Sequence, residues 1–150
     1  MLFRSPHELL LVERNDSGRI VAATVVTLQP ETLNRRLLWK TSLLRAFMPG
    51  ALRLWRLVAG GGGGTHAPEM ILLFTAPEER RHGRGQSLVR RIDAQLLERG
   101  VREYEVRTET DPANVALAFY RRLGFMARRV ETRLGVSFQV FARTVLDERQ

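Results

Sequence analysis

A buried strand, a glycine-containing turn and an amphipathic helix follow one another without a break near the middle of the chain. The run 70–74 has the sequence MILLF, which is typical of a strand buried on both faces. The turn, residues 80–85, has the sequence RRHGRG. Apolar residues then recur at helical spacing from Leu88 to Leu97, with charged residues on the opposite side. This order predicts an α/β unit in which the turn joins the end of the strand to the start of the helix.

The turn has the composition of an anion-binding site. Two glycines, Gly83 and Gly85, stand among four basic residues: Arg80, Arg81, His82 and Arg84. Glycine lets the backbone bend tightly and present its N–H groups. A helix start leaves such groups without internal partners, and its dipole favours an anion. We therefore predict a pyrophosphate site here; an ordinary turn with a solvated basic face is the alternative.

Two other phosphate-binding motifs do not match this turn. A P-loop requires lysine and then serine or threonine after its last glycine, whereas Gly85 is followed by Gln86 and Ser87. A dinucleotide-binding fingerprint requires a third glycine, and Leu88 occupies that position. Both classes are therefore excluded.

Length and composition exclude further chemistries. A chain of 150 residues can bury about 70% of its unfolded surface in one domain. The absence of cysteine excludes disulfides, thiolate ligands and cysteine nucleophiles. Three histidines, His7, His66 and His82, are too scattered for a metal-ligand pattern, so we expect no metal. No apolar run approaches the roughly 20 residues that span a bilayer, and residues 1–8 lack signal-peptide character, so we expect a cytoplasmic protein.

Residues 31–64 form a basic, apolar insertion that ends in five consecutive glycines. Residues 32–68 contain six basic and no acidic residues, so they supply +6 of the net charge of +8. The remaining +2 does not indicate a specific nucleic-acid partner. Two short helices are predicted on either side of Pro49-Gly50, and the glycines predict a flexible connector. The pair 31–59 could pack on the domain, contact a membrane peripherally, or form a homodimer contact or an acceptor-binding lid.

The remaining segments predict one mixed sheet. Hydrophobic alternation and turn residues predict strands at 8–14, 19–28, 69–75, 103–109, 125–133 and 136–145, with helices ending near 99 and spanning 112–123. Asp111-Pro112 is a helix-start signal, because aspartate caps and proline needs no N–H donor at the first helical position. The fold class is therefore α/β, with helices flanking one mixed sheet.

Two motifs in this order resemble those of the GCN5-related N-acetyltransferase (GNAT) family. Residues 80–85 fit Arg/Gln-x-x-Gly-x-Gly/Ala, the acetyl-CoA loop of that family. Residues 114–125, NVALAFYRRLGF, resemble the second signature, Asn-x-x-Ala-x-x-Phe-Tyr-x-x-x-Gly-Phe, with only the alanine placement loose. The resemblance covers about residues 8–28 and 69–145. It implies a single GNAT-like domain over residues 1–150, with a splayed central strand pair and the helical insertion.

The resemblance also implies acetyl-CoA as cosubstrate and assigns residues to it. Pyrophosphate candidates are Arg80, His82, Gly83, Arg84, Gly85, Gln86 and Ser87. A backbone N–H near Phe74 or Thr75 would polarise the thioester carbonyl, and Phe119 would line the coenzyme site. Asn114 would bond the pantetheine or a backbone carbonyl, with local capping as the alternative. Tyr120 stands where the family places its thiolate-facing tyrosine, and a phenol with pKa near 10 can protonate a thiolate; a core tyrosine is the alternative.

The catalytic base and the acceptor are less constrained. Glu69 is our first candidate for the base, because several family members carry a carboxylate there; Glu109, His66 or a water chain are alternatives. In the family a strand and two helices usually precede the first hairpin, and this chain has seven residues there, so we expect them to be missing or to lie upstream. The function implied is an acetyl-CoA-dependent N-acetyltransferase for a small-molecule amine such as an amino sugar. The alternative is a catalytically incomplete module that binds acyl-CoA, a membrane or a partner.

Overall fold

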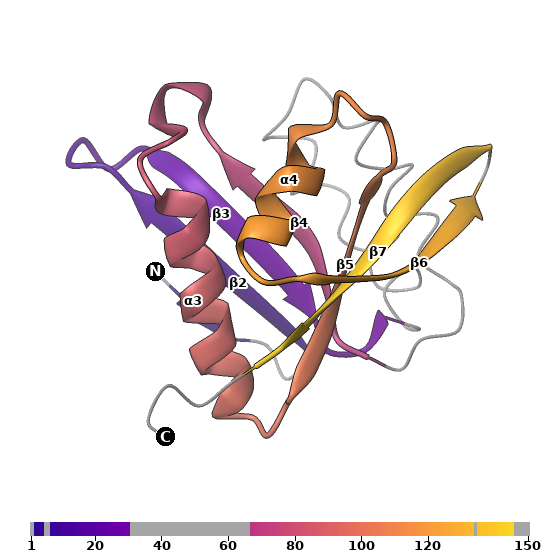
Figure 1. Cartoon of the computed structure of the whole chain (residues 1–150). Coiled ribbons are helices and arrows are strands. Elements are labelled where there is room, and N and C mark those ends of the chain that lie inside the picture. The colour runs from indigo at the N-terminus through magenta and orange to yellow at the C-terminus, as the bar shows by residue number, and fades with distance from the viewer. Residues whose placement is uncertain (1, 5–6, 31–66, 134, 146–150) are drawn as a thin grey trace.

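One seven-stranded mixed sheet forms the frame of the molecule (Figure 1). The structure is a computed structural model, which describes residues 2–4, 7–30, 67–133 and 135–145. The strands are β1 (Leu2–Arg4), β2 (Glu8–Arg14), β3 (Ile20–Thr27), β4 (Glu69–Thr75), β5 (Glu103–Glu109), β6 (Met126–Arg133) and β7 (Val136–Thr144). They lie in the order β1-β2-β3-β4-β5-β7-β6, and only β4 and β5 are parallel neighbours. The predicted mixed sheet and both predicted hairpins are confirmed.

Strand β1 was not predicted. It pairs antiparallel with β2, with Phe3 opposite Leu10. The expectation that no strand precedes the first hairpin is therefore wrong. Three residues are too few to show a hydrophobic period, so only the pairing with β2 reveals this strand. The predicted insertion 31–64, with its membrane, dimer and lid interpretations, lies outside the described residues, and the single-domain organisation stays a prediction.

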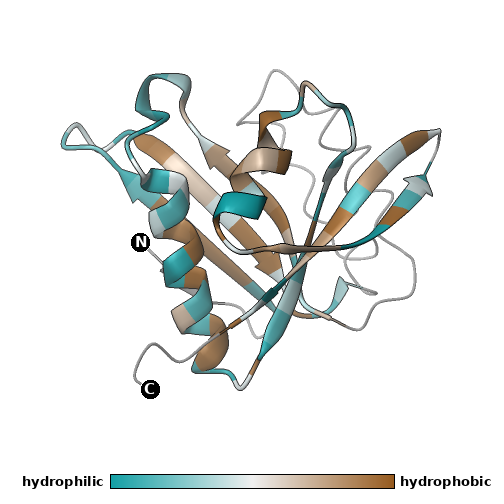
Figure 2. Ribbon diagram, in the orientation of Figure 1, coloured by the Kyte–Doolittle hydropathy of each residue, from teal (hydrophilic) through white to brown (hydrophobic). Residues whose placement is uncertain are grey.

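Both described helices lie on one face of the sheet, called here the helical face (Figure 1). Helix α3 (Arg84–Leu97) packs on β2, β3 and β4. Its buried residues are Leu88, Val89, Ile92 and Leu96, the stripe that the spacing predicts, and its outer side is hydrophilic (Figure 2). Helix α4 (Val115–Arg122) packs Tyr120 against Phe141 of β7. A short 3₁₀ turn, η1 (Pro77–Glu79), links β4 to the loop before α3. The opposite face of the sheet is called the second face.

The central strands β4 and β5 pair only at their beginnings. Each runs for seven residues, but the register joins only Glu69 to Glu105 and Met70 to Val106. Beyond this second pair, the divergence point, β4 stays paired with β3 and β5 with β7. Ile71 is an extra residue in β4, a β-bulge that bends the strand where the two part. The predicted splayed strand pair is confirmed.

Helix α4 begins later than its sequence signal indicates. Asp111-Pro112 predicted the start, but the helix begins at Val115 with Asn114 as its N-cap. Asp111 instead closes the preceding turn, where its Oδ1 accepts a hydrogen bond of 2.8 Å from the N–H of Ala113. Both side chains accept from a backbone N–H two residues ahead, so the sequence offers two caps three residues apart. The later one is used.

Asn114 also ties α4 to the end of β5. Its Oδ1 accepts from the N–H of Ala116 at 3.1 Å. Its Nδ2 donates to the hydroxyl of Thr108 and to the carbonyl of Glu109, each at 2.8 Å. Both amide hydrogens are therefore committed within the protein, which matches the capping and backbone-carbonyl alternatives of the sequence analysis.

We expect Asn114→Ala to lower the free energy of unfolding by about 2 kcal/mol, because it removes a cap and two further hydrogen bonds. Asp111→Ala, which removes one exposed hydrogen bond, should cost less than about 1 kcal/mol. Urea denaturation followed by circular dichroism measures both. The reverse ranking would make Asp111 the functional cap.

Candidate active site

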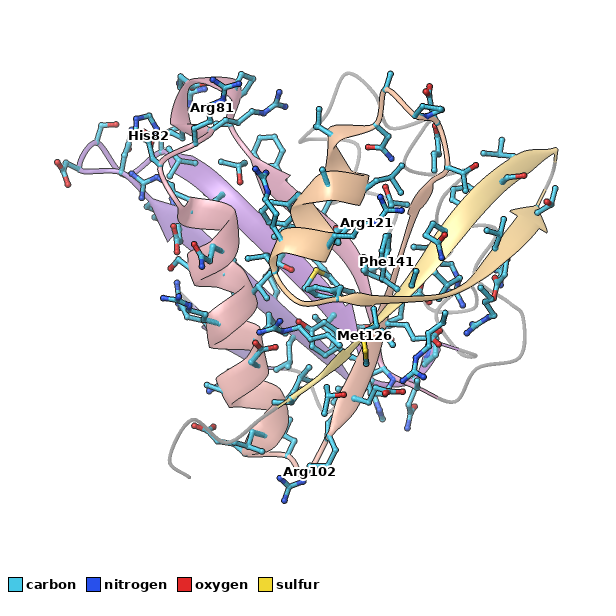
Figure 3. All side chains as sticks on the ribbon, viewed as in Figure 1. Arg81, His82, Arg102, Arg121, Met126 and Phe141 are labelled. Carbon is cyan, nitrogen blue, oxygen red and sulfur yellow. The ribbon has the colours of Figure 1, made fainter. Side chains whose placement is uncertain are left out.

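The anion-binding turn, residues 80–85, lies beyond the divergence point at the carboxyl end of β4 (Figure 3). Gly83 is the N-cap of α3 with a φ of 77°, and no side chain caps this helix. The first bond inside the helix runs from the N–H of Ser87 to the carbonyl of Gly83 at 2.9 Å. In the described part of the chain the N–H groups of residues 84–86 therefore have no partner and are available to an anion.

Acidic neighbours already engage two of the predicted ligands. Arg84 pairs with Glu79 at 2.7 Å and with Glu13 at 3.6 Å. The hydroxyl of Ser87 donates to Glu13 at 2.9 Å. Glu13 lies 74 residues from Ser87 along the chain. It was not predicted, because only the packing of α3 on β2 brings the two residues together. These contacts hold the helix start in place and reduce the positive charge of the turn.

The other basic residues of the turn face solvent. Arg81 and His82 are exposed at the tip of the loop (Figure 3), and Arg81 has a φ of 66°, which costs free energy in a residue other than glycine. Arg80 is exposed and donates to the carbonyl of Thr75 at 3.5 Å. The exposed Gln86 lies in the first helical turn. Arginine and histidine at the loop tip can therefore approach a phosphate without first leaving a buried position.

Gly85 marks the close approach of the two helices. A Cβ atom at this position would lie 3.2 Å from the ring of Phe119 and 3.7 Å from the hydroxyl of Thr75. Its φ is not positive, unlike that of Gly83, so space rather than backbone conformation requires glycine here. Three of the predicted coenzyme-binding residues, Thr75, Gly85 and Phe119, are thus brought together.

The backbone of β4 presents alternate amides to the space between the parted strands. The N–H of Ala76 donates to Val21 of the β3 side at 2.8 Å. Backbone groups alternate in direction along a strand, so Phe74, opposite Ala23, also bonds toward β3. Thr75 therefore turns its N–H toward β5, and so does Leu73, a position that was not predicted. Of the two predicted carbonyl-polarising positions, the geometry favours Thr75 over Phe74.

Tyr120 lies on the helical face beside the divergence point. Its ring is 6.0 Å from that of Phe141 in β7. Phe141 is the partner of Val106, which is in turn the last residue of β5 paired with Met70 of β4. The ring is buried, and its hydroxyl has no hydrogen-bond partner among the described residues. Burial raises the pKa of Tyr120 to about 12, so the phenol stays protonated at neutral pH.

The second tyrosine of the chain is committed to the core. The hydroxyl of Tyr104 donates to Asp93 of α3 at 3.0 Å. Asp93 also accepts from the guanidinium of Arg143 at 2.7 Å. Burial, and then the negative charge of Asp93, raise the pKa of Tyr104 above its ordinary value. Of the two phenols, only that of Tyr120 is therefore without a partner in the described part of the chain.

Glu69 lies on the second face, opposite Tyr120. The next residue, Met70, belongs to the core under the helices, and side chains alternate along a strand, so Glu69 points the other way. Only 7% of this residue is exposed. Its Oε2 forms an ion pair with Nη1 of Arg107. Burial raises the pKa of Glu69 above its ordinary value, and Arg107 opposes this shift only in part.

Glu69 belongs to an ionic cluster on the second face, which comprises Glu69, Glu105, Arg107, Arg129, Glu131 and Arg133. The three carboxylates and three guanidiniums come from β4, β5 and β6. Except for Glu69, these residues were not predicted, since no local pattern shows that β7 pairs with β5 and so brings β6 within reach of β5. Charges alternating with apolar residues along β5 and β6 were the signal available.

The other candidates for the base lie elsewhere. Glu109 ends β5 in an exposed position beyond the divergence point. His66 lies outside the described residues. Within the described ranges no group of side chains has the makeup of a metal site. No helix there is long and apolar enough to cross a membrane.

Comparison with known proteins identifies the family. The family model of the acetyltransferase (GNAT) domain matches residues 50–127, more than half of the chain. This chain therefore belongs to the GNAT acetyltransferases, as its two motifs predicted. A search of curated proteins finds no match.

Solved structures show the same fold at low sequence identity. The ribosomal-protein-S18-alanine N-acetyltransferase from Escherichia coli is 14% identical with a TM-score of 0.61, over 98% of this chain and 76% of that one. Nourseothricin acetyltransferase is 19% identical with a TM-score of 0.63, over 94% and 67%. An N-acetyltransferase from Staphylococcus aureus is 11% identical with a TM-score of 0.59, over 93% and 68%. These similarities establish the GNAT fold of the described sheet and helices.

We expect the two tyrosines to differ in their contribution to stability. Tyr104→Phe should lower the free energy of unfolding by about 1–2 kcal/mol, because it removes a hydrogen bond to a carboxylate. Tyr120→Phe should change it by less than about 0.5 kcal/mol, since no described hydrogen bond is lost. Urea titrations of both variants provide the measurement, and a large loss in Tyr120→Phe would reveal an unrecognised partner of its hydroxyl.

Proposed function

We propose that the protein is an acetyl-CoA-dependent N-acetyltransferase that acetylates a small-molecule amine by direct attack in a ternary complex. The observation that carries this proposal is the position of Tyr120. A phenol without a described partner lies on the helical face beside the divergence point, and Glu69 lies on the second face near the same point. An acid and a base on opposite sides of one opening suit acyl transfer through it.

The coenzyme would extend along the space between the parted strands. Its pyrophosphate would accept hydrogen bonds from the N–H groups of residues 84–86, which the helix leaves without partners. From the anion-binding turn to the divergence point, β4 runs from Thr75 back to Met70, about 17 Å at 3.3 Å per residue. The pantetheine arm would lie along this edge beside Phe119, and the amides of Leu73 and Thr75 are available to its polar groups.

The reaction requires three proton transfers, two of which involve residues of the protein. The carboxylate of Glu69 would accept a proton from the ammonium group of the acceptor, and the neutral amine would then attack the thioester carbonyl carbon. The C–S bond breaks as the C–N bond forms, and the Tyr120 phenol would protonate the departing thiolate. The amide nitrogen releases its second proton to solvent. The products are an N-acetylated amine, coenzyme A and one proton per turnover.

The acceptor is proposed only as a class. Two structural relatives carry names that refer to nourseothricin and to an alanine of ribosomal protein S18, so the shared fold accommodates different acceptors. An amino sugar is one member of the class that we propose to test. Because the reaction uses acetyl-CoA, a cytoplasmic location is part of the same proposal.

Coenzyme binding tests the role of the anion-binding turn. Gly83→Ala should weaken coenzyme A binding at least about tenfold, because alanine disfavours the positive φ that presents the helix-start amides. Gly135→Ala is the matched control: it has the same φ of 77°, nothing within 4 Å of its added Cβ, and a place in the β6–β7 turn. Isothermal calorimetry measures both affinities. Equal affinities in the two variants would contradict the assignment of the turn.

Turnover tests the role of Tyr120. Tyr120→Phe should lower kcat about 10- to 1000-fold with little change in coenzyme affinity, because the thiolate would leave without a proton donor. Tyr104→Phe is the control, since its hydroxyl is bonded to Asp93. A thiol reagent measures the coenzyme A released from acetyl-CoA with a panel of amines that includes an amino sugar. The chain has no cysteine, so the signal comes from the coenzyme alone.

Two outcomes would redirect the proposal. Unchanged turnover in Tyr120→Phe would remove this residue from the mechanism. Coenzyme binding by the wild-type protein without transfer to any amine of the panel would favour the alternative of a binding module.

A further inference from the structure

The three carboxylates of the ionic cluster differ in how many of their oxygens have a guanidinium partner. Glu105 accepts from Arg129 through both oxygens, at 2.8 and 3.0 Å. Glu131 also uses both: Oε1 accepts from Arg129 at 2.7 Å, and Oε2 from Arg133 at 2.8 Å. Glu69 has a partner on Oε2 alone, so its Oε1 has none among the described residues. It is therefore the carboxylate of this cluster with an oxygen that no described guanidinium occupies.

Arg107 lies where it can control that carboxylate. It is the first residue of β5 after the divergence point and points to the second face. Its guanidinium forms an ion pair with Glu69, lies 3.3 Å from Glu131 and lies 4.0 Å from Glu105. Its side chain is only 9% exposed. One buried cation is thus shared by three carboxylates that originate from three strands.

We propose that Arg107 is a positioning residue for acetyl transfer, which anchors Oε2 of Glu69 and leaves Oε1 to receive the proton of the acceptor ammonium. This inference rests on the proposed function, in which Glu69 is the base. Nothing in the motifs of the family or in the sequence pattern assigns a role to Arg107; its role follows from the bonding of the cluster.

Burial explains why the base needs this cation. A carboxylate removed from water without a counter-ion takes up a proton at neutral pH and cannot act as a base. Both Arg107 and Arg133 lower the pKa of Glu69, whereas burial and Glu105 raise it. Charged residues surround Glu69 on one side: Glu105 and Arg107 of β5, and Arg129, Glu131 and Arg133 of β6. On the other side its register partner is the uncharged Thr27 of β3, which in turn pairs with Glu8 of β2. Arg107 is the one that contacts Glu69 directly.

The charge and the fixed geometry of Arg107 can be separated by substitution. Arg107→Gln removes the cation, whereas Arg107→Lys retains a charge without the planar fork that binds several carboxylates. Arg128→Gln is the matched control, because Arg128 also joins β6 to β5 through a pair with Glu103 at 2.7 Å, but at the surface. Circular dichroism and urea denaturation establish that each variant is folded before it is compared.

Two measurements on the 150-residue chain test the proposal. The first is a carbon-13 NMR titration of the Glu69 carboxyl, assigned by its loss in Glu69→Gln, which requires no substrate. The second is the pH dependence of kcat/KM with acetyl-CoA and the best amine of the panel. In Arg107→Gln the pKa of Glu69 should rise by at least about one unit, and kcat/KM at neutral pH should fall about tenfold or more and recover as the pH is raised. Arg107→Lys should lie between this variant and the wild type, and Arg128→Gln should match the wild type.

The outcomes separate this inference from the proposed function. An unchanged titration of Glu69 in Arg107→Gln overturns the positioning role, whatever the enzyme does. A shifted titration with an unshifted pH profile also overturns it, because the carboxylate would then not limit turnover. Full activity of Glu69→Gln contradicts instead the proposed base. If Arg107→Gln does not fold, the same two measurements are made on Arg107→Lys. A shift of both the Glu69 titration and the pH profile supports the positioning role, and the absence of both shifts overturns it.

Discussion

The early end of the ladder between β4 and β5 is the constraint on which the rest of the structure depends. Two residue pairs join these strands. The bulge at Ile71, the next residue of β4, then bends this strand away from β5. Each strand keeps its other neighbour, so the sheet opens at its centre without losing its outer pairings. Backbone groups that a continuous sheet would bond internally become available to a ligand. Side chains from both faces can also reach one point.

The helices hold this opening in a defined shape. Gly85 allows Phe119 of α4 to approach the first turn of α3, and Asn114 fixes the start of α4 to the end of β5. At the other end of α3, Asp93 accepts from both Tyr104 and Arg143, which joins the helix to β5 and β7. These contacts cross the divide on the helical face. The two halves of the sheet are thus connected by side chains as well as by the two residue pairs of their backbones.

The fold was largely predictable because its signals are local. The hydrophobic run at 70–74 and the alternation over 103–109 identify strands from neighbouring residues alone. The predicted start of α4 was wrong because Asp111 and Asn114 are both good caps. Which of the two caps the helix depends on the hydrogen bonds of Asn114 to β5. Strand β1 was missed because three residues carry no period.

The candidate site was predictable only where a motif is contiguous. Gly83 and Tyr120 belong to continuous signatures, whereas Glu13 and Arg107 reach the site through pairings that no local pattern reveals. The same holds for Thr75: the pattern of hydrogen bonds to β3, rather than its identity, turns its amide toward the opening. Residues that act through long-range register therefore require the structure.

The ionic cluster has a second consequence, for the solubility of the molecule. Strand β6 is one of the two outermost strands of the sheet among the described residues, and its exposed Met126 and Val130 offer an apolar template for another strand. Arg129, Glu131 and Arg133 stand on this same strand, and a foreign strand added there would have to cover their charges. Charged residues on a free edge are a common protection against aggregation. Neutral replacements of these three charged residues in β6 would therefore lower the solubility of the protein.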